Sequence, residues 1–217
     1  MTRSAPILLT GFEPFGGEPV NPSALIAAAL DGARIDGVPV ATRILPCTFA
    51  ASLHELDAAM QAHAPQLVLC LGQAAGREGL SIERVAINVN DARIPDNVGA
   101  RPIDEPVCAD GPTAYWSTLP IKAMCAGLQQ AGIACGVSQS AGTFVCNHVF
   151  YGLMHRLAAR PRVRGGFMHV PLLPEQRQRH PGHPSMPLDT MIDGVRRSLT
   201  LALRHHTDLR TVGGAIA

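Results

Sequence analysis

The most informative stretch of this chain is Val137-Ser-Gln-Ser-Ala-Gly-Thr-Phe-Val-Cys146-Asn147-His148. It follows a short apolar run, Ala134 to Val137, and leads into apolar-periodic residues from Phe144 to Leu157. This order predicts a strand, a tight turn and a helix, with Cys146 near the first helical turn. The N–H groups of that turn lack intrahelical partners and carry the positive end of the helix dipole, which favours a thiolate. Cys146 is therefore a candidate nucleophile, although simple burial of a small apolar side chain is the alternative.

The same alternation of strands and helices continues on both sides of this stretch. Asn21-Pro22-Ser23 supplies a helix cap with proline at the first helical position. The alternation predicts a single-domain three-layer α/β/α sandwich over residues 1–217, with a mostly parallel, mixed and twisted sheet. The patterns predict strands at 7–10, 38–45, 67–71, 82–89, 134–137 and 165–170, and helices at 24–30, 50–62, 119–131, 145–157 and 188–203.

Composition excludes several classes of partner. The chain has 217 residues with 18 basic and 17 acidic side chains and few aromatic ones, so no basic, aromatic-studded face for nucleic acid is expected. The apolar run Ile7–Leu9 is too short for a signal peptide, and no stretch is long enough to span a bilayer. We expect a cytoplasmic protein that binds neither nucleic acid nor membrane, with any tail after His206 frayed.

The cysteines are scattered, with no C-x-x-C pair and no close Cys–His cluster. In a reducing cytoplasm this pattern predicts free thiols rather than disulfides or a structural zinc site. The loop Gly11–Gly17 lacks the Lys-Ser/Thr of a P-loop and the spacing of a dinucleotide fingerprint. We therefore expect no metal and no cofactor. The six cysteines are Cys47, Cys70, Cys108, Cys125, Cys135 and Cys146.

Candidate partners for the thiol follow from strand position, because active residues of open α/β sheets gather at the carboxyl ends of strands. We expect such ends after residues 9, 71, 137 and 170. His169 lies at the last of these, and its alternative is a hydrogen-bonded core histidine. Glu83 is predicted to begin a strand after a glycine-rich loop, and its alternative is an exposed carboxylate paired with Arg84. Phe12 and Phe15 follow the first strand and suggest an apolar pocket wall, with core packing as the alternative.

Several separated segments, in one order along residues 7–203, together resemble a known family. The resemblance is to pyroglutamyl peptidase I, a family of cytoplasmic cysteine exopeptidases. A departure is Gln139-Ser140, where relatives often have Asn-Thr. The segments are Leu9-Thr-Gly-Phe-Glu-Pro-Phe-Gly-Gly17 with Asn21-Pro-Ser23, Gly72-Gln-Ala-Ala-Gly-Arg77 with Ile82-Glu-Arg-Val-Ala-Ile-Asn88, Asn90-Asp-Ala-Arg-Ile-Pro-Asp-Asn97, Ser138 to His148, Gly166-Phe-Met-His-Val-Pro171 with Pro174-Glu-Gln176, and Pro184-Ser-Met186.

The resemblance implies a function and a set of site residues. The reaction would be hydrolysis of the amide bond after an N-terminal pyroglutamyl residue of small peptides, releasing pyroglutamate through a thioester acyl-enzyme. The family often forms homo-oligomers, so a dimer or tetramer is expected. The implied catalytic residues are Glu83, Cys146 and His169, and the implied substrate-binding residues are Phe12, Phe15, Gln73, Arg93, Phe144 and the backbone near Val145.

Two other interpretations remain open from the residues. A nucleoside-phosphorylase-like transferase could share this architecture, but it would need a phosphate site that the first loop does not offer. An inactive binding scaffold would be indicated by a missing member of the triad, and none is missing. Arg93 also has a structural alternative, as a cation that pairs with Asp91 or Asp96 in its own loop.

Overall fold

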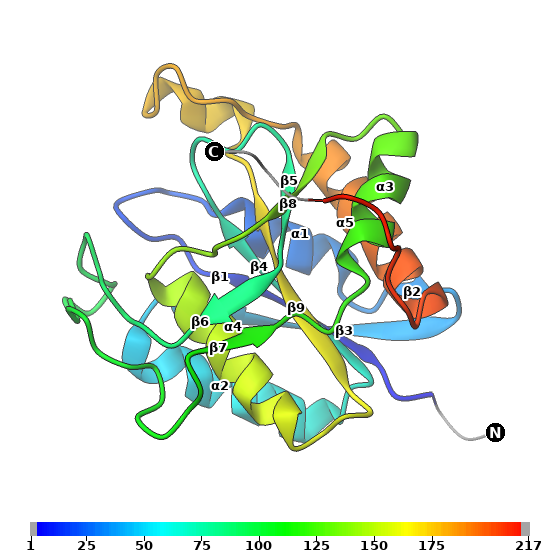
Figure 1. Ribbon diagram of the computed structural model, residues 1–217. Coiled ribbons are helices and arrows are strands. Elements are labelled where there is room, and N and C mark those ends of the chain that lie inside the picture. The colour runs from blue at the N-terminus through cyan, green and yellow to red at the C-terminus, as the bar shows by residue number, and fades with distance from the viewer. Residues whose placement is uncertain (1–3, 214–217) are drawn as a thin grey trace.

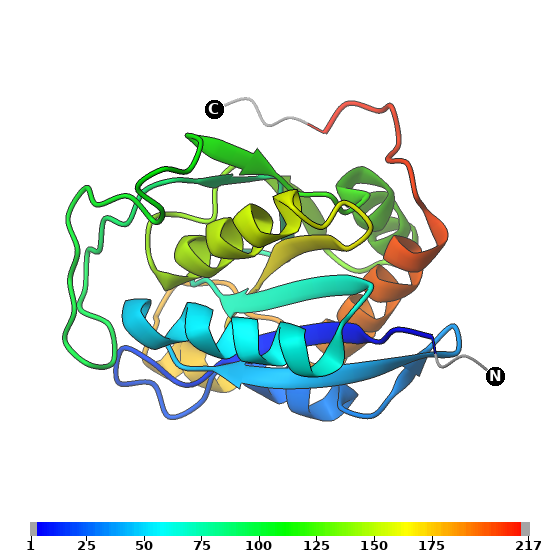
Figure 2. The same cartoon turned by 90° about the horizontal axis from the view of Figure 1, so that it is seen from below.

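A seven-stranded sheet between two helical layers organises the computed structural model, which describes residues 4–213 (Figure 1). The strand order is β2-β3-β1-β4-β9-β5-β8. Helices α1, α3 and α5 pack on one face and α2 and α4 on the other, as both views show (Figures 1 and 2). The predicted three-layer sandwich is confirmed. The strands are β1 Ile7–Phe12, β2 Arg34–Ile35, β3 Val38–Leu45, β4 Leu67–Gln73, β5 Leu80–Glu83, β6 Val85–Ile87, β7 Ala114–Trp116, β8 Cys135–Ser138 and β9 Arg164–Val170, and the helices are α1 Pro22–Leu30, α2 Phe49–His63, α3 Ile121–Gln130, α4 Val145–Ala158 and α5 Leu188–Arg204, with a 3₁₀ turn at Pro174–Gln178.

The sheet is mixed because β5 and β8 run antiparallel to the central strands. β1, β3, β4 and β9 run parallel, whereas β5 is antiparallel to β9 and β8 is parallel to β5. The connection from β4 to β5 is too short for the crossover that a parallel strand would need. The carboxyl end of β8 therefore does not lie at the edge formed by β1, β4 and β9, but the chain that follows β8 returns to that edge, so the junction after residue 137 still carries candidate site residues.

One predicted strand is two strands in different sheets. β5 ends at Glu83, and β6 pairs with β7 in a separate two-stranded sheet. Arg84 N donates to Ser138 O at 2.9 Å, the last link before the chain leaves the main sheet. Glu83 thus ends a strand rather than beginning one. No glycine or proline marks this break, so the alternation of apolar residues runs through it without a signal.

Side-chain alternation on the central strands decides which helical layer the site faces. On β9, Met168 packs with the cluster under α1, α3 and α5, whereas Phe167 packs with the cluster under α2 and α4. Successive side chains of a strand point to opposite faces, so His169 shares the face of Phe167. Gly72 is the register partner of His169 on β4 and faces the same way.

The long segment 90–112 is irregular, as its composition indicates, apart from one bridge between Asn90 and Glu105. It projects from the side of the molecule (left in Figure 1). Asp96 ties it to α2 by accepting from Phe49 N at 2.9 Å. A functional role for this segment requires that it reach the site, and its residues 91–94 do so.

The chain after α5 is not frayed over the residues described. Asp208 accepts from the N–H groups of Lys122 and Ala123, both at 3.0 Å, and so caps α3, whose own cap residue Pro120 offers no side-chain acceptor. The expectation of a frayed tail was wrong for this part, and its last residues, 214–217, lie outside the described range, as do residues 1–3 of the N-terminal segment. No helix among residues 4–213 is long and apolar enough to cross a membrane.

Candidate active site

A cavity of about 280 Å³ opens where β4 and β9 end. Its walls combine the loop after β1, the end of β4, residues 91–94 and residues 141–144, with Cys146 and His169 among the lining side chains. A larger hollow of about 820 Å³ lies at the other end of the sheet, but Arg34 and His63 are the only titratable residues among its lining residues within 4–213. The smaller cavity is the one that joins a thiol to an imidazole.

Cys146 is the second residue of α4, and Phe144, the cap residue, offers no side-chain hydrogen bond to the free N–H groups. The predicted helix position is therefore confirmed. Its expected effect on the thiol is opposed by burial, which raises the pKa of Cys146 well above its usual value, with Cys47 and Glu83 acting in the same direction. A protonated thiol is then the resting form, and a base must take its proton before attack.

His169 is held by Glu83 through a hydrogen bond of 2.8 Å between Nδ1 and Oε1. Glu83 is fully buried and His169 is 4% exposed. An ionised carboxylate can only accept, so Nδ1 carries the proton and Nε2 is left as the basic nitrogen. The two residues come from antiparallel neighbours, β5 and β9, and lie on one face of the sheet.

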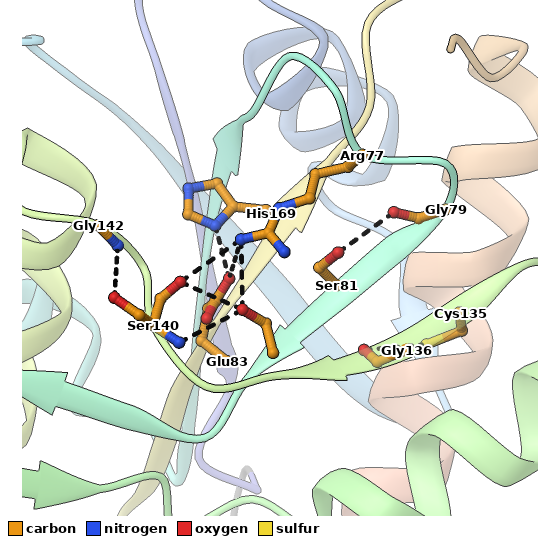
Figure 3. Close-up of polar contacts among 10 residues, drawn as sticks. Arg77, Gly79, Ser81, Glu83, Cys135, Gly136, Ser140, Gly142 and His169 are labelled. Atoms are coloured by element: carbon orange, nitrogen blue, oxygen red, sulfur yellow. Dashed lines mark hydrogen bonds and ion pairs between the residues drawn. The ribbon is translucent and has the colours of Figure 1, made fainter. Parts of the chain in front are cut away.

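Arg77 lies over this pair and was not identified from the sequence (Figure 3). Its Nη2 is 3.6 Å from Glu83 Oε1 and donates to Ser138 Oγ at 3.3 Å and Ser140 O at 3.4 Å. The second carboxylate oxygen of Glu83, Oε2, is buried without a partner. Since a buried carboxylate needs a compensating partner, Arg77 places a positive charge beside Glu83. Arg77 sits in the segment Gly72–Arg77, but spacing within an irregular loop does not predict which side chain turns inward.

The expected pocket residues separate into two groups. Phe15, Gln73, Arg93 and Phe144 line the cavity, and the Phe15 and Phe144 rings lie 6.2 Å apart between centroids. Phe12 is 2% exposed and packs against Phe167 at 6.4 Å. Phe12 is outside the lining because it is the last residue of β1 and points into the core under α2 and α4.

Val145 can offer only its backbone to a ligand, whereas Arg93 can offer its side chain. The Val145 side chain is fully buried at the start of α4, so only its backbone can serve a ligand. Arg93 is exposed in its loop, and within residues 4–213 it forms no ion pair with a carboxylate. Asp96 instead accepts from backbone N–H groups, including Ala100 N at 2.8 Å. The guanidinium of Arg93 is therefore available to the cavity, where it is the one cation among the described lining residues.

Gly72 makes room for the sulfur. A Cβ at this position would lie 2.7 Å from Cys146 Sγ and 2.8 Å from Phe167 Cζ, closer than real Cβ contacts. We expect Gly72→Ala to lower kcat on any substrate that Cys146 attacks by about 10², because a reacting atom displaced by about 1 Å loses that much. Gly136→Ala in β8 is the matched control, since nothing lies within 4 Å of its added Cβ. Equal kcat values for the two variants would show that the close approach is unimportant.

His148 makes the folding stability of the protein depend on pH. Its Nδ1 lies 3.0 Å from Asn90 Oδ1, at the start of the loop 90–112, and its Nε2 is buried without a partner. Burial lowers the pKa of His148 to about 4. The unfolded chain protonates this residue near pH 6.5, so stability is complete above that pH and falls as pH drops towards 4, by up to about 3 kcal/mol.

This prediction can be checked by urea unfolding between pH 7.5 and 4.5, comparing the wild type with His148→Gln. A glutamine can keep a hydrogen bond to Asn90 without titrating. The fall in unfolding free energy between pH 6.5 and 4.5 should be smaller in the variant. Parallel curves for the two proteins would contradict the prediction.

Comparisons with known proteins all match the chain to one kind of peptidase. The family model described as pyroglutamyl peptidase matches residues 5–205. The chain is 54% identical over 212 residues to a pyrrolidone-carboxylate peptidase of Cupriavidus taiwanensis, covering 97% of this chain and 98% of that one. A second relative with the same name, from Escherichia fergusonii, is 52% identical over 209 residues, covering 96% and 98%.

Solved structures give the same result. The crystal structure of pyroglutamyl peptidase I from Bacillus amyloliquefaciens superposes with a TM-score of 0.94 at 43% identity, covering 96% of this chain and 100% of that one. A mutant pyrrolidone carboxyl peptidase from Pyrococcus furiosus superposes with a TM-score of 0.89 at 41% identity, covering 91% and 98%. The similarity extends over the strands and helices that carry the cavity.

Proposed function

The chain belongs to the pyroglutamyl peptidase family, and from this premise we propose that it removes an N-terminal pyroglutamyl residue from small peptides, with Cys146 as nucleophile. The observation that carries the proposal is the hydrogen bond of 2.8 Å between Glu83 and His169 at the cavity that Cys146 lines. A buried carboxylate, an oriented imidazole and a thiol form the set that acyl transfer needs.

The first half of the reaction forms an acyl-enzyme. His169 Nε2 takes the proton of Cys146, and the sulfur attacks the carbonyl carbon that joins the lactam ring to the next residue. The negative oxygen that forms is met by the backbone N–H of Cys146, free at the start of α4, and by the guanidinium of Arg93. His169 then gives its proton to the leaving amine, the C–N bond breaks, and a thioester remains.

The second half releases the product. Water enters, gives a proton to His169 and attacks the thioester carbon through its oxygen. The C–S bond breaks, free pyroglutamate leaves and the thiol recovers its proton. Glu83 keeps the imidazole in the useful tautomer in both halves and stabilises its cation, and Arg77 places a positive charge beside the carboxylate of Glu83.

The cavity suits the lactam ring. The ring is flat and apolar on its faces, and its edge has one N–H donor and one carbonyl acceptor. Phe15 and Phe144 offer aromatic walls, while Gln73 offers a polar group to the edge. Phe12 supports these walls from the core, and the backbone near Val145 is a further candidate for the edge. A phosphate-dependent transferase gains no support, since Arg93 is the one arginine or lysine among the described lining residues and Asp91 lines the cavity beside it.

The compartment, the oligomeric state and the domain organisation of the enzyme are also part of the proposal. We place it in the cytoplasm as a homo-oligomer with a single catalytic domain over residues 1–217. Six free thiols are consistent with a reducing compartment. Exposed apolar side chains such as Trp116, 68% exposed, and Ile103, also 68% exposed, are candidates for contacts between subunits.

The function is tested with a pyroglutamyl amide of a chromogenic amine. We expect release of the amine and of free pyroglutamate, inactivation by a thiol-alkylating reagent and no loss of rate with a chelator. Added free pyroglutamate should slow the alkylation, because it fills the cavity in front of Cys146. Turnover that survives alkylation but not chelation would point to a metal enzyme and end the proposal.

A further inference from the structure

One buried side-chain amide lines the cavity, and its orientation is determined by residues outside the cavity. Gln73 ends β4, is 8% exposed and lines the cavity. Its Oε1 accepts a hydrogen bond of 3.1 Å from Nε2 of Gln176, which lies in the 3₁₀ turn Pro174–Gln178. An amide can present either a donor or an acceptor to a ligand, so the group that occupies one end decides what the other end offers.

Gln176 is itself fixed at both ends. Its Oε1 accepts from Leu173 N at 3.0 Å, and a backbone N–H can only donate. Its Nε2 donates to Glu18 Oε2 at 2.9 Å. Burial would raise the pKa of Glu18, but hydrogen bonds from Gln176 and His180 bring it below its usual value. The carboxylate of Glu18 is therefore ionised near neutral pH and can only accept.

A fixed donor at one end and a fixed acceptor at the other leave one orientation for Gln176. Its Nε2 must also be the atom that faces Gln73 Oε1. Gln176 is 3% exposed, so bulk solvent hardly reaches these positions. The Nε2 group of Gln73, with its two N–H donors, has no acceptor among the described residues and is not enclosed by protein. It is the end that remains for the cavity.

We propose that Glu18 and Gln176 are positioning residues that hold Gln73 as a hydrogen-bond donor to the lactam carbonyl of the substrate. This inference rests on the proposed function. The carbonyl is the group that distinguishes pyroglutamyl from prolyl, since the two rings are otherwise of similar size and shape. Neither Glu18 nor Gln176 is among the residues that line the cavity, so their effect on selectivity passes through Gln73.

The test is the exchange Glu18→Gln with Gln176→Glu in one protein. Charge and the number of side-chain atoms are conserved, but the carboxylate now lies at position 176. It still accepts from Leu173 N, and its second oxygen must accept from both the new amide at position 18 and the amide of Gln73. Gln73 then turns its Nε2 away from the cavity and presents Oε1 to the substrate, where it faces another acceptor.

We expect kcat/KM for a pyroglutamyl amide to fall by about 10² in the double variant, mostly through KM, with little change for the prolyl amide of the same amine. The rate of alkylation of Cys146 by iodoacetamide should stay within a factor of two or so, because the nucleophile is not touched. Gln176→Met is the second variant, since it removes the constraint without reversing it. It should lower the same kcat/KM by about tenfold.

The outcomes distinguish a failure of this inference from a failure of the proposed function. A double variant that keeps the wild-type ratio of pyroglutamyl to prolyl hydrolysis overturns the inference and leaves the proposed function intact. If the double variant fails to fold, unchanged selectivity of Gln176→Met overturns it equally. A wild-type enzyme that hydrolyses neither amide overturns the proposed function, and the inference with it.

Discussion

Cys146→Ala is expected to lower kcat/KM for a pyroglutamyl amide by about 10⁵ or more, the scale on which other acyl-transfer enzymes respond to loss of the nucleophile. No other thiol lines the cavity among the described residues, so no neighbour can replace the sulfur. The variant should melt near the wild-type temperature, because Cys146 borders a cavity rather than the close-packed core and alanine is a good helix former. Binding of free pyroglutamate should survive, since the aromatic walls and Gln73 remain.

Cys108→Ala is the matched control for this experiment. Cys108 is half-buried and also lies near an imidazole, with its Sγ 3.7 Å from His155 Nε2. It is outside the cavity, so its loss should leave kcat/KM unchanged. Activity that depends on Cys108 and persists without Cys146 would move the nucleophile to another part of the molecule.

Discrimination between rings is the second large effect. The wild type should hydrolyse a pyroglutamyl amide about 10⁴ times more efficiently than the prolyl amide of the same amine. Prolyl lacks the carbonyl, which leaves the buried amide of Gln73 unpaired. Its ring nitrogen is also a cation at neutral pH, and moving that charge out of water into the cavity adds to the cost of binding.

The ratio is measured as kcat/KM for the two amides in one buffer, with amine release as the common signal. Raising the pH until the prolyl nitrogen is neutral should recover only the part of the ratio that comes from charge. The remainder is the contribution of the lost carbonyl. A ratio below about tenfold would mean that the cavity does not recognise the edge of the ring.

Local patterns in the sequence predicted the elements that carry the chemistry. Cys146 lies in the first turn of a helix because small residues precede an apolar-periodic run. His169 lies next to the last residue of a strand whose apolar character leaves few other places for an imidazole. The cap at Asn21 is also present, with its side chain accepting from Ser23 N at 3.1 Å. Each of these features depends on neighbours within a few residues, which is what periodicity and capping rules describe.

Features that depend on distant neighbours were not predictable in the same way. The position of β5 in the sheet depends on β9, which pairs beside it although the two strands are far apart in sequence, 86 residues counting from Glu83 to His169. Strands of two or three residues, such as Arg34–Ile35 and Ala114–Trp116, are too short to show a period. The inward turn of Arg77 depends on the same long-range packing, which no spacing along the chain encodes.

The strand order also determines when the enzyme can first become active during synthesis. β9 lies between β4 and β5, so these two strands have no common neighbour until residues 164–170 have left the ribosome. Before that point Glu83 has no imidazole to orient and Cys146 has no base. A nascent or partly folded chain therefore has no thiol that can attack a peptide. Peptidase activity begins only when β9 has joined the sheet, which is a late step in a fold rich in long-range contacts.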